Sequence, residues 1–268
     1  MWAHRSVSRS STLPGERTHF TRILPSMYLT IHHGVQRFLA LILCLGLFGG
    51  TVRATEKPVR HVPDTMAQRT QACTVCHGKE GRATNAGYFP RIAGKPAAYL
   101  RNQMVNFRDG RRTYAAMTHL VDHLSDAYLL EIANYFADLN LPYPAPQTVN
   151  APAAAMERGR MLVQHGDEQR DLPACVQCHG SAMTGVAPAI PGLLGLPRDY
   201  LTGQLGAWQN GKRHTPAPDC MAQVAKRLSA EDVSAIAFWL SAQALPNNSH
   251  AATATATRRP LDCGSAPQ

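Results

Sequence analysis

The pentapeptide Cys-x-x-Cys-His occurs twice in this chain, at 73–77 and at 175–179. In this motif the two thiols add across the vinyl groups of a haem, and the histidine becomes the proximal ligand of the iron. A disulfide framework or a Cys/His zinc site would not explain why histidine directly follows the second cysteine in both copies. A thioredoxin-like motif would need a βαβ pattern around it, and the sequence has none. The sequence therefore predicts two covalently bound haem c groups, attached through Cys73, Cys76, Cys175 and Cys178, with iron ligands His77 and His179.

A wider repeat surrounds the two motifs. Five positions recur at an offset of 101 residues: Tyr99, Leu100, Gln103, Gly110 and Arg112 correspond to Tyr200, Leu201, Gln204, Gly211 and Arg213. Further along, the offset is 104, so that Met117 corresponds to Met221 and Ser125 to Ser229. The change indicates a three-residue insertion between Arg213 and Met221. The chain is thus a tandem duplication of a domain of about 85–95 residues.

Each copy has the pattern of a small helical domain. Ser125 and Ser229 are expected N-caps of helices with one apolar face. A second helix in each copy is expected from Tyr99 to Gly110 and from Tyr200 to Gly211, where glycine suits the C-terminal cap. A further helix is expected over 153–165 with Pro152 in its first turn, and no strand is expected. The predicted fold is all-α, with two tandem helical domains each wrapped around a haem.

The predicted domain boundaries follow from composition. Residues 1–54 are expected to be a secretory signal, because the apolar run 38–48 follows Arg37 and precedes small residues ending at Ala54. Met27 would give a signal of ordinary length, so that 1–26 would be an over-long start. The run is too short for a comfortable membrane span. The remaining segments are predicted as domain 1 (55–141), a stiff Pro-rich linker (142–152), domain 2 (153–244) and a C-terminal tail (245–268).

The leftover cysteines and the net charge add two expectations. Haem c attachment and a secretory signal both place the protein in the oxidising periplasm. Of the seven cysteines, Cys44 lies in the signal and four carry haem, which leaves Cys220 and Cys263 for a disulfide, or as two unpaired thiols. The formal charge of +9 arises largely in the signal, and four haem propionates offset most of the rest. The charge therefore gives no argument for nucleic acid.

The sixth ligand of each iron decides between electron transfer and catalysis. Met117 and Met221 are the expected ligands, because they correspond in the repeat and a thioether favours ferrous iron. A lone methionine is more often core filler. His119 and His123 are competing donors, but neither has a counterpart near Met221, so they are interpreted as surface histidines. The Cys220 thiolate stays open as an alternative ligand in the second copy.

Four more residues are expected near the haems. The carbonyls of Pro90 and Pro191 are placed to accept the ring N–H of the proximal histidines and so to fix their tautomer. Simple loop prolines are the alternative. Arg112 and Arg213 are expected to neutralise haem propionates, or else to be solvated charges at helix ends.

Over about 63–243 the chain resembles the dihaem cytochrome c4 family, which has two class I cytochrome c domains. The resemblance is carried by both haem motifs, the segments 89–94, 99–103 and 107–112, their counterparts 191–195 and 200–204, and both methionines. It implies a soluble or membrane-surface periplasmic carrier with His/Met haems. Such a carrier takes electrons from a dehydrogenase or a quinol-oxidising complex and passes them to a terminal oxidase.

Two departures from the family keep other functions in view. The insertion with Cys220 and the tail with Cys263 suggest a sub-group that serves a particular dehydrogenase. The leading expectation is a one-electron carrier with no catalytic residue. One alternative is an enzyme resembling dihaem thiosulfate dehydrogenase, with Cys220 as a haem ligand. The other is a cytochrome subunit bound permanently to a periplasmic dehydrogenase.

Overall fold

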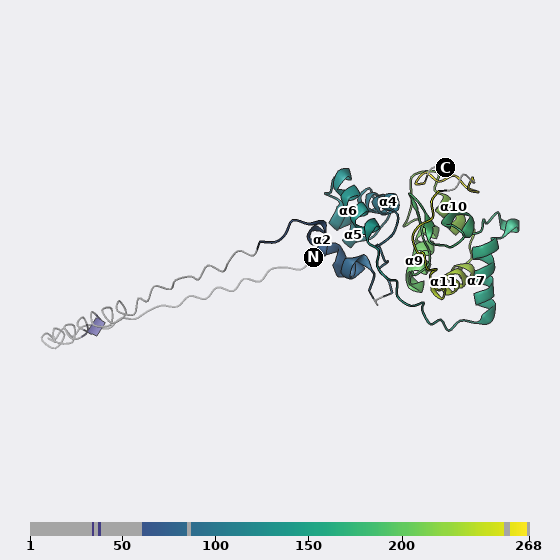
Figure 1. Ribbon diagram of the computed structural model, residues 1–268, viewed down its shortest axis with the longest axis horizontal. Helices are drawn as coiled ribbons and strands as arrows, with labels where there is room; N and C mark the ends of the chain where they lie inside the picture. Colours follow the sequence, from purple (N-terminus) through teal and green to yellow (C-terminus); the bar gives the residue numbers. More distant parts are fainter. Residues whose placement is uncertain (1–33, 35–36, 39–60, 85–86, 255–257, 267–268) are drawn as a thin grey trace, which may run out of the picture. The chain divides into compact units, whose positions relative to one another are not determined.

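The computed structural model describes residues 34, 37–38, 61–84, 87–254 and 258–266. The predicted signal therefore lies almost entirely outside the described residues. From His61 onward the chain forms one compact unit that is mainly helical, as Figure 1 shows. No helix within the described ranges combines the length and apolar character needed to cross a membrane.

The first repeat is built around two packed helices. Its elements are α2 (Met66–Arg69), α3 (Gln71–His77), the 3-10 helix η1 (Lys79–Gly81), α4 (Ala97–Arg108), α5 (Ala115–Val121) and α6 (Asp126–Asp138). Helix α4 packs on α6 through a buried apolar cluster that includes Leu100, Ile132 and Phe136. As predicted, α6 begins after Ser125, whose hydroxyl accepts a hydrogen bond from the Tyr128 amide at 3.2 Å.

The second repeat has the same arrangement with a longer first helix. Its helices are α7 (Ala153–His165), the 3-10 helix η2 (Glu168–Arg170), α8 (Val176–His179), α9 (Arg198–Gln209), α10 (Cys220–Lys226) and α11 (Ala230–Ser241). Ser229 caps α11 in a reciprocal capping box with Asp232. Helix α7 crosses α11 closely at Gly159, where an added Cβ would lie 2.1 Å from the Ala235 carbonyl oxygen. Only glycine fits this crossing without a shift of one helix.

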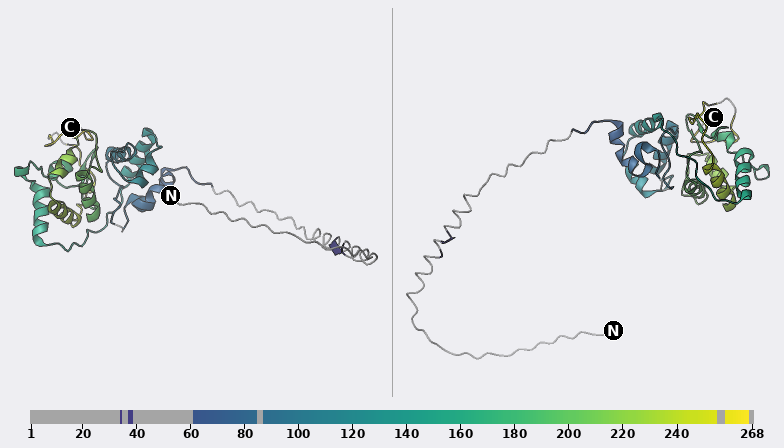
Figure 2. Two further views of the ribbon diagram at one scale, coloured as in Figure 1. Left: turned by 180° about the vertical axis from the view of Figure 1, so that it is seen from behind. Right: turned by 60° about the horizontal axis from the view of Figure 1, so that its bottom comes forward.

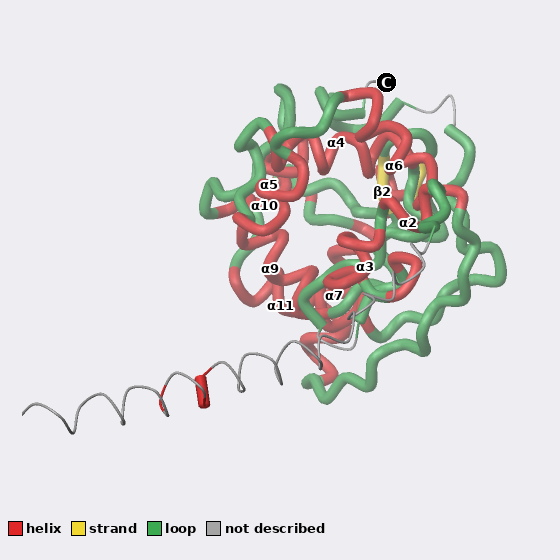
Figure 3. The backbone as a smooth tube through the Cα atoms, turned by 90° about the vertical axis from the view of Figure 1, so that its left-hand side faces the viewer, coloured by secondary structure: helices red, strands yellow, loops and turns green. Residues whose placement is uncertain are grey.

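The helical prediction is confirmed, with corrections at the ends of helices and in one loop. Helices α4 and α9 begin two residues earlier than expected, after the prolines Pro96 and Pro197. Pro152 is the N-cap of α7 rather than part of its first turn. The expectation of no strand was wrong for β1 (Gly185–Val186) and β2 (Ile190–Pro191), which pair antiparallel. Figure 3 shows this short sheet among the helices.

The non-helical segment between the repeats is hydrogen-bonded to both of them. The guanidinium of Arg91, in the first repeat, is 2 % exposed and donates to the carbonyls of Leu141 and Pro142 at 2.5 and 3.0 Å. Further along, the Gln147 amide donates to the Ser241 carbonyl at 3.0 Å. The views in Figure 2 show the two groups of helices next to each other. Because hydrogen bonds fix the segment at both ends, it holds the repeats in contact.

Candidate cofactor site

The two motif histidines are buried and oriented in the same way. His77 ends α3 and His179 ends α8, and each is 8 % exposed. The Nδ1 atom of His77 lies 2.9 Å from the Pro90 carbonyl oxygen, and that of His179 lies 2.8 Å from the Pro191 oxygen. Burial lowers the pKa of both histidines. A neutral ring that donates from Nδ1 keeps its Nε2 lone pair for a metal.

The four motif cysteines have free thiol groups. None of them forms a disulfide. Burial raises the pKa of Cys175 to about 12 and also raises the pKa of Cys73 and Cys178. The described residues also contain no group of three or more His, Cys, Asp or Glu that could hold a metal ion. The disulfide and zinc alternatives are therefore not supported.

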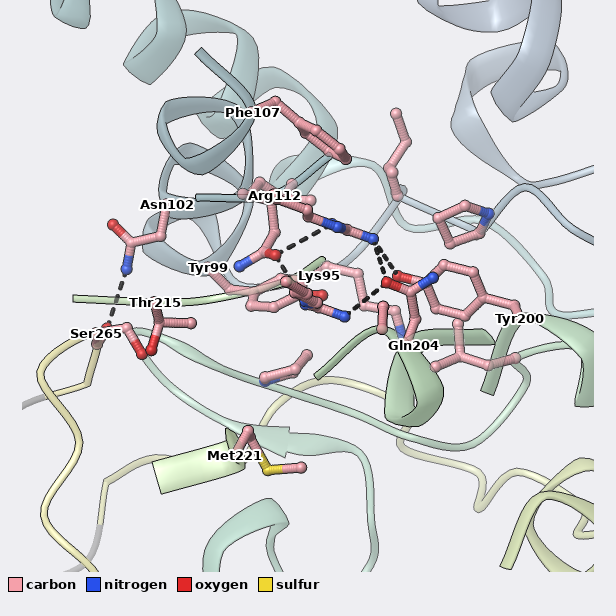
Figure 4. Close-up of a pocket in the computed structure, with 18 of the residues that line it drawn as sticks. Lys95, Tyr99, Asn102, Phe107, Arg112, Tyr200, Gln204, Thr215, Met221 and Ser265 are labelled. Carbon is pink, nitrogen blue, oxygen red and sulfur yellow. Dashed lines mark hydrogen bonds between the residues drawn. The ribbon is translucent and has the colours of Figure 1, made fainter. Parts of the chain in front are cut away.

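A cavity of about 630 Å³ extends through both repeats. Both histidines and all four thiols line it, together with mainly apolar side chains. Met117 on α5 and Met221 on α10 are half-buried and also line it. Figure 4 shows the side chain of Met221 in this pocket. The alternative ligands His119 and His123 are exposed.

Arg112 and Arg213 lie at the interface between the repeats, each donating to glutamines of both. Arg112 donates to Gln103 of its own repeat at 3.1 Å and to Gln204 of the other at 2.7 Å. Arg213 donates to Gln204 at 2.8 Å and to Gln103 at 2.8 Å. Arg112 also donates to the Tyr200 hydroxyl at 3.2 Å, as Figure 4 shows. Both arginines are buried, so the alternative of solvated charges at helix ends was wrong.

Two buried donors in this region indicate what the cavity accommodates. Of the described residues, Trp208 and Arg213 line the cavity and have a buried side-chain N–H group, Nε1 and Nε respectively, without a hydrogen-bond partner in the protein. Buried donors in native proteins are normally satisfied. The carboxylates of a haem supply acceptors of the required charge, and the apolar walls suit its ring. The residues present therefore fit two haems attached at the two motifs.

The structure also shows the state of the two cysteines that haem attachment leaves over, Cys220 and Cys263. Cys220 and Cys263 form the predicted disulfide, across a sequence separation of 43 residues. The alternative of two unpaired thiols was wrong. Because the Cys220 sulfur is bound to Cys263, it is not available as a thiolate ligand. Met221 is then the remaining soft donor that the repeat pattern places in this cavity.

Sequence reasoning missed one buried charge near the second motif. Lys95 belongs to the first repeat, is 4 % exposed, and donates from Nζ to the Gly192 carbonyl at 3.1 Å. Burial lowers its pKa to about 7. Its counterpart in the second repeat is Leu196. That exchange of lysine for leucine was the available signal, since a lysine at a buried position needs a hydrogen-bond partner.

Comparison with known proteins gives relatives but no family model, since none matches the chain. The "Thiosulfate dehydrogenase electron acceptor" of Thiomonas intermedia is 37 % identical over 175 residues, which are 65 % of this chain and 79 % of that protein. Cytochrome c4 of Pseudomonas aeruginosa is 31 % identical over 75 % of this chain and 96 % of its own length. The crystal structure of reduced recombinant cytochrome c4 from Pseudomonas stutzeri matches with a TM-score of 0.58 and 28 % identity, over 66 % of this chain and 96 % of that one.

Proposed function

The chain belongs to the cytochrome c4 family of dihaem electron carriers, and we propose that it accepts electrons from a dehydrogenase that oxidises thiosulfate and passes them towards a terminal oxidase. The name of the Thiomonas relative supports this donor. Two covalently bound haems supply the redox chemistry. The protein residues attach them, orient the proximal histidines and exclude water.

The proposed iron ligands are His77 with Met117 and His179 with Met221. The observation that carries the assignment is that both members of each pair line the same cavity while the competing Cys220 is held in a disulfide. Filled coordination at both irons favours electron transfer, because no position stays open for a substrate. The same disulfide argues against the alternative in which Cys220 marks a catalytic haem. The chain is accordingly a carrier and not an enzyme.

Arg112 and Arg213 are proposed to hold haem propionates at the interface between the repeats, with Trp208 as a further donor in the second repeat. Position 107, the counterpart of Trp208, is phenylalanine and has no N–H group. The two haems would therefore differ in hydrogen bonding to their propionates. Different hydrogen bonding and charge tune the potentials of otherwise similar haems.

Export to the periplasm is also proposed. It is supported by the disulfide, which persists in oxidising compartments, by the chemistry of haem c attachment, and by the signal predicted over 1–54. Binding to a membrane surface stays a proposal from the family resemblance. A permanent complex with a dehydrogenase would be detected by copurification of the protein with that enzyme from native membranes or periplasm.

The ligand assignment is tested by the absorption spectrum of the oxidised protein in the far red. Two His/Met haems give a Met-to-iron charge-transfer band, and Met117→Ala and Met221→Ala should each remove about half of its intensity. Met183→Leu is the control, because Met183 is buried outside the cavity lining. An unchanged band in either Ala variant would rule out that methionine as a ligand. Reduction by Thiomonas intermedia thiosulfate dehydrogenase with thiosulfate tests the proposed donor.

A further inference from the structure

The C-terminal segment 258–266 packs against the part of the cavity that the second repeat lines, which we call the second crevice. Cys263 and Ala266 are buried in one cluster with Ile190. Ile190 precedes Pro191, whose carbonyl oxygen lies next to the ring of His179. Gly264 donates from its amide to the Pro218 carbonyl at 2.9 Å, and an added Cβ at Gly264 would lie 2.3 Å from the Ala217 oxygen. The segment is therefore in close backbone contact with the inserted loop that precedes α10.

The same segment forms part of the cavity wall and reaches the first repeat. Four of its residues line the cavity: Leu261, Cys263, Ser265 and Ala266. The Ser265 carbonyl accepts a hydrogen bond from the Asn102 side chain on α4 at 3.0 Å, as Figure 4 shows. The disulfide ties the segment to Cys220, directly beside Met221. A covalently tethered piece of the chain thus forms part of the wall of the second crevice.

The equivalent positions of the first repeat are exposed and apolar. Tyr88 is 47 % exposed, whereas its counterpart Ala189 packs against the C-terminal segment. Leu120 on α5 is 37 % exposed, whereas its counterpart Val224 packs into the second core. Both Tyr88 and Leu120 line the cavity. Exposed apolar side chains at the mouth of a binding cavity are typical of an interaction site.

The first motif adds a further exposed apolar side chain. Val75 lies between the two haem-binding cysteines and is 79 % exposed. Its counterpart in the second motif is the polar Gln177, which is also exposed. Near this face the Arg69 guanidinium is paired with the Asp64 carboxylate at 2.6 Å, and the His123 ring is hydrogen-bonded to Asp122 at 3.0 Å. The face therefore complements an apolar partner surface with little net charge.

We propose that this face of the first repeat, formed by Val75, Tyr88 and Leu120, is the docking surface for a redox protein whose contact face is apolar and nearly uncharged, and that the C-terminal segment keeps such partners off the second repeat. This rests on the proposed function. Electrons then enter and leave through the first haem, and the second haem exchanges electrons with the first through the shared interior. Docking by apolar contact also predicts a rate that changes little with ionic strength.

Oxidation of the fully reduced protein by ferricyanide locates the exchange site without any protein partner. Each ferricyanide trianion takes one electron and becomes ferrocyanide. A new negative charge at the exchange site repels the oxidant, so Val75→Glu should slow the reaction about two- to fivefold at low ionic strength. The matched control is Gln177→Glu, which keeps the oxygen that accepts from the Ala174 amide, and it should leave the rate unchanged. An equal or larger effect of Gln177→Glu would overturn the proposal.

Release of the C-terminal segment is the second part of the ferricyanide experiment. In a Cys220→Ser/Cys263→Ser background the second crevice opens, and Gln177→Glu should then slow ferricyanide oxidation as Val75→Glu does. Gly264→Val, which displaces the segment by its close backbone contacts, should act in the same direction, whereas Gly206→Ala, which meets no atom within 4 Å and lies outside the cavity lining, should have no effect. If Gln177→Glu has no effect in the released forms, the segment does not shield the second repeat.

The rate at which Thiomonas thiosulfate dehydrogenase reduces the protein tests whether the partner docks on the first repeat. Tyr88→Ser/Leu120→Ser should lower the second-order rate of reduction at least about fivefold, because apolar contact area is lost. An undiminished rate would overturn the docking surface. If the enzyme does not reduce even the unmodified protein, the proposed donor is wrong, and the ferricyanide comparison still decides which repeat exchanges electrons.

Discussion

Arg112 and Arg213 pair with each other through an isolated antiparallel β-bridge where the two repeats meet. Each guanidinium stacks on an aromatic ring of its own repeat, Arg112 on Phe107 at 4.5 Å and Arg213 on Trp208 at 3.8 Å. In the described part of the chain neither forms an ion pair with a carboxylate. Two buried positive charges so close together need an anionic partner, and we propose that the propionates of the two haems provide it.

Loss of the charge at Arg213 should therefore lower the potential of the second haem. A buried positive charge destabilises ferric iron relative to ferrous iron, so Arg213→Met should reduce that potential by about 50 mV. The measurement is a spectroelectrochemical titration of both haems. Arg198→Met, which removes a half-exposed arginine of the same repeat, is the control and should shift neither potential. An unchanged potential in Arg213→Met would mean that Arg213 does not face a propionate.

Trp208→Phe should make the second haem more like the first. The substitution gives position 208 the residue found at position 107 and removes the buried Nε1–H group without a protein partner. A propionate that loses this donor is less stabilised in its ionised form. We expect a higher pKa for the redox-linked proton of the second haem, measured as a shift in the pH dependence of its potential. Phe107→Leu serves as the control, since it removes no donor. A pH dependence identical to that of the unmodified protein would contradict the assignment.

The Cys220–Cys263 disulfide should contribute measurably to stability. It closes a loop of 43 residues, and a cross-link of this kind restricts the unfolded chain by about 2–4 kcal/mol. Cys220→Ser/Cys263→Ser should lower the free energy of unfolding in denaturant by this amount, and a thiol reductant should do the same to the unmodified protein but not to the double variant. Equal stability of both proteins under oxidising conditions would show that the disulfide contributes nothing.

The sequence predicted the elements that have a local signal and missed those that depend on packing between distant parts of the chain. The caps Ser125 and Ser229 and the α7 helix were predicted because capping and apolar periodicity are local properties. The disulfide followed from counting the cysteines left over after haem attachment in a protein that is expected to be exported. By contrast, the position of the C-terminal segment depends on packing between residues far apart in the chain, for which a single sequence holds no periodic signal.

The arginines illustrate the same limit. Their recurrence after Gly110 and Gly211 indicated a role near the haems, but not that each would bond to a glutamine of the other repeat. Such a contact depends on how the two domains are arranged, and the pattern within each domain is compatible with many arrangements. Lys95 was missed for the same reason, because its acceptor is the Gly192 carbonyl of the second repeat.

The buried Lys95 should give the protein a distinct dependence of stability on pH. Its ordinary pKa of 10.5 applies to the unfolded chain, and burial lowers the folded value to about 7. Between these values the unfolded chain holds more protons than the folded one, so stability should rise with pH by up to about 1.4 kcal/mol per unit. Below pH 7 both states are protonated, and the cost of burying the charge is fully present.

Lys95→Met keeps the apolar stem and removes the titrating group, so it should abolish this rise and stabilise the protein most at neutral and acidic pH. The measurement is denaturant unfolding of the haem-containing protein from pH 6 to pH 10, which brackets the folded pKa of Lys95. Lys226→Met, at an exposed lysine of α10, should keep the slope of the unmodified protein. If Lys95→Met retains that slope, Lys95 remains charged within the folded protein and is paired with an anion, for which a haem propionate is the nearest chemical candidate.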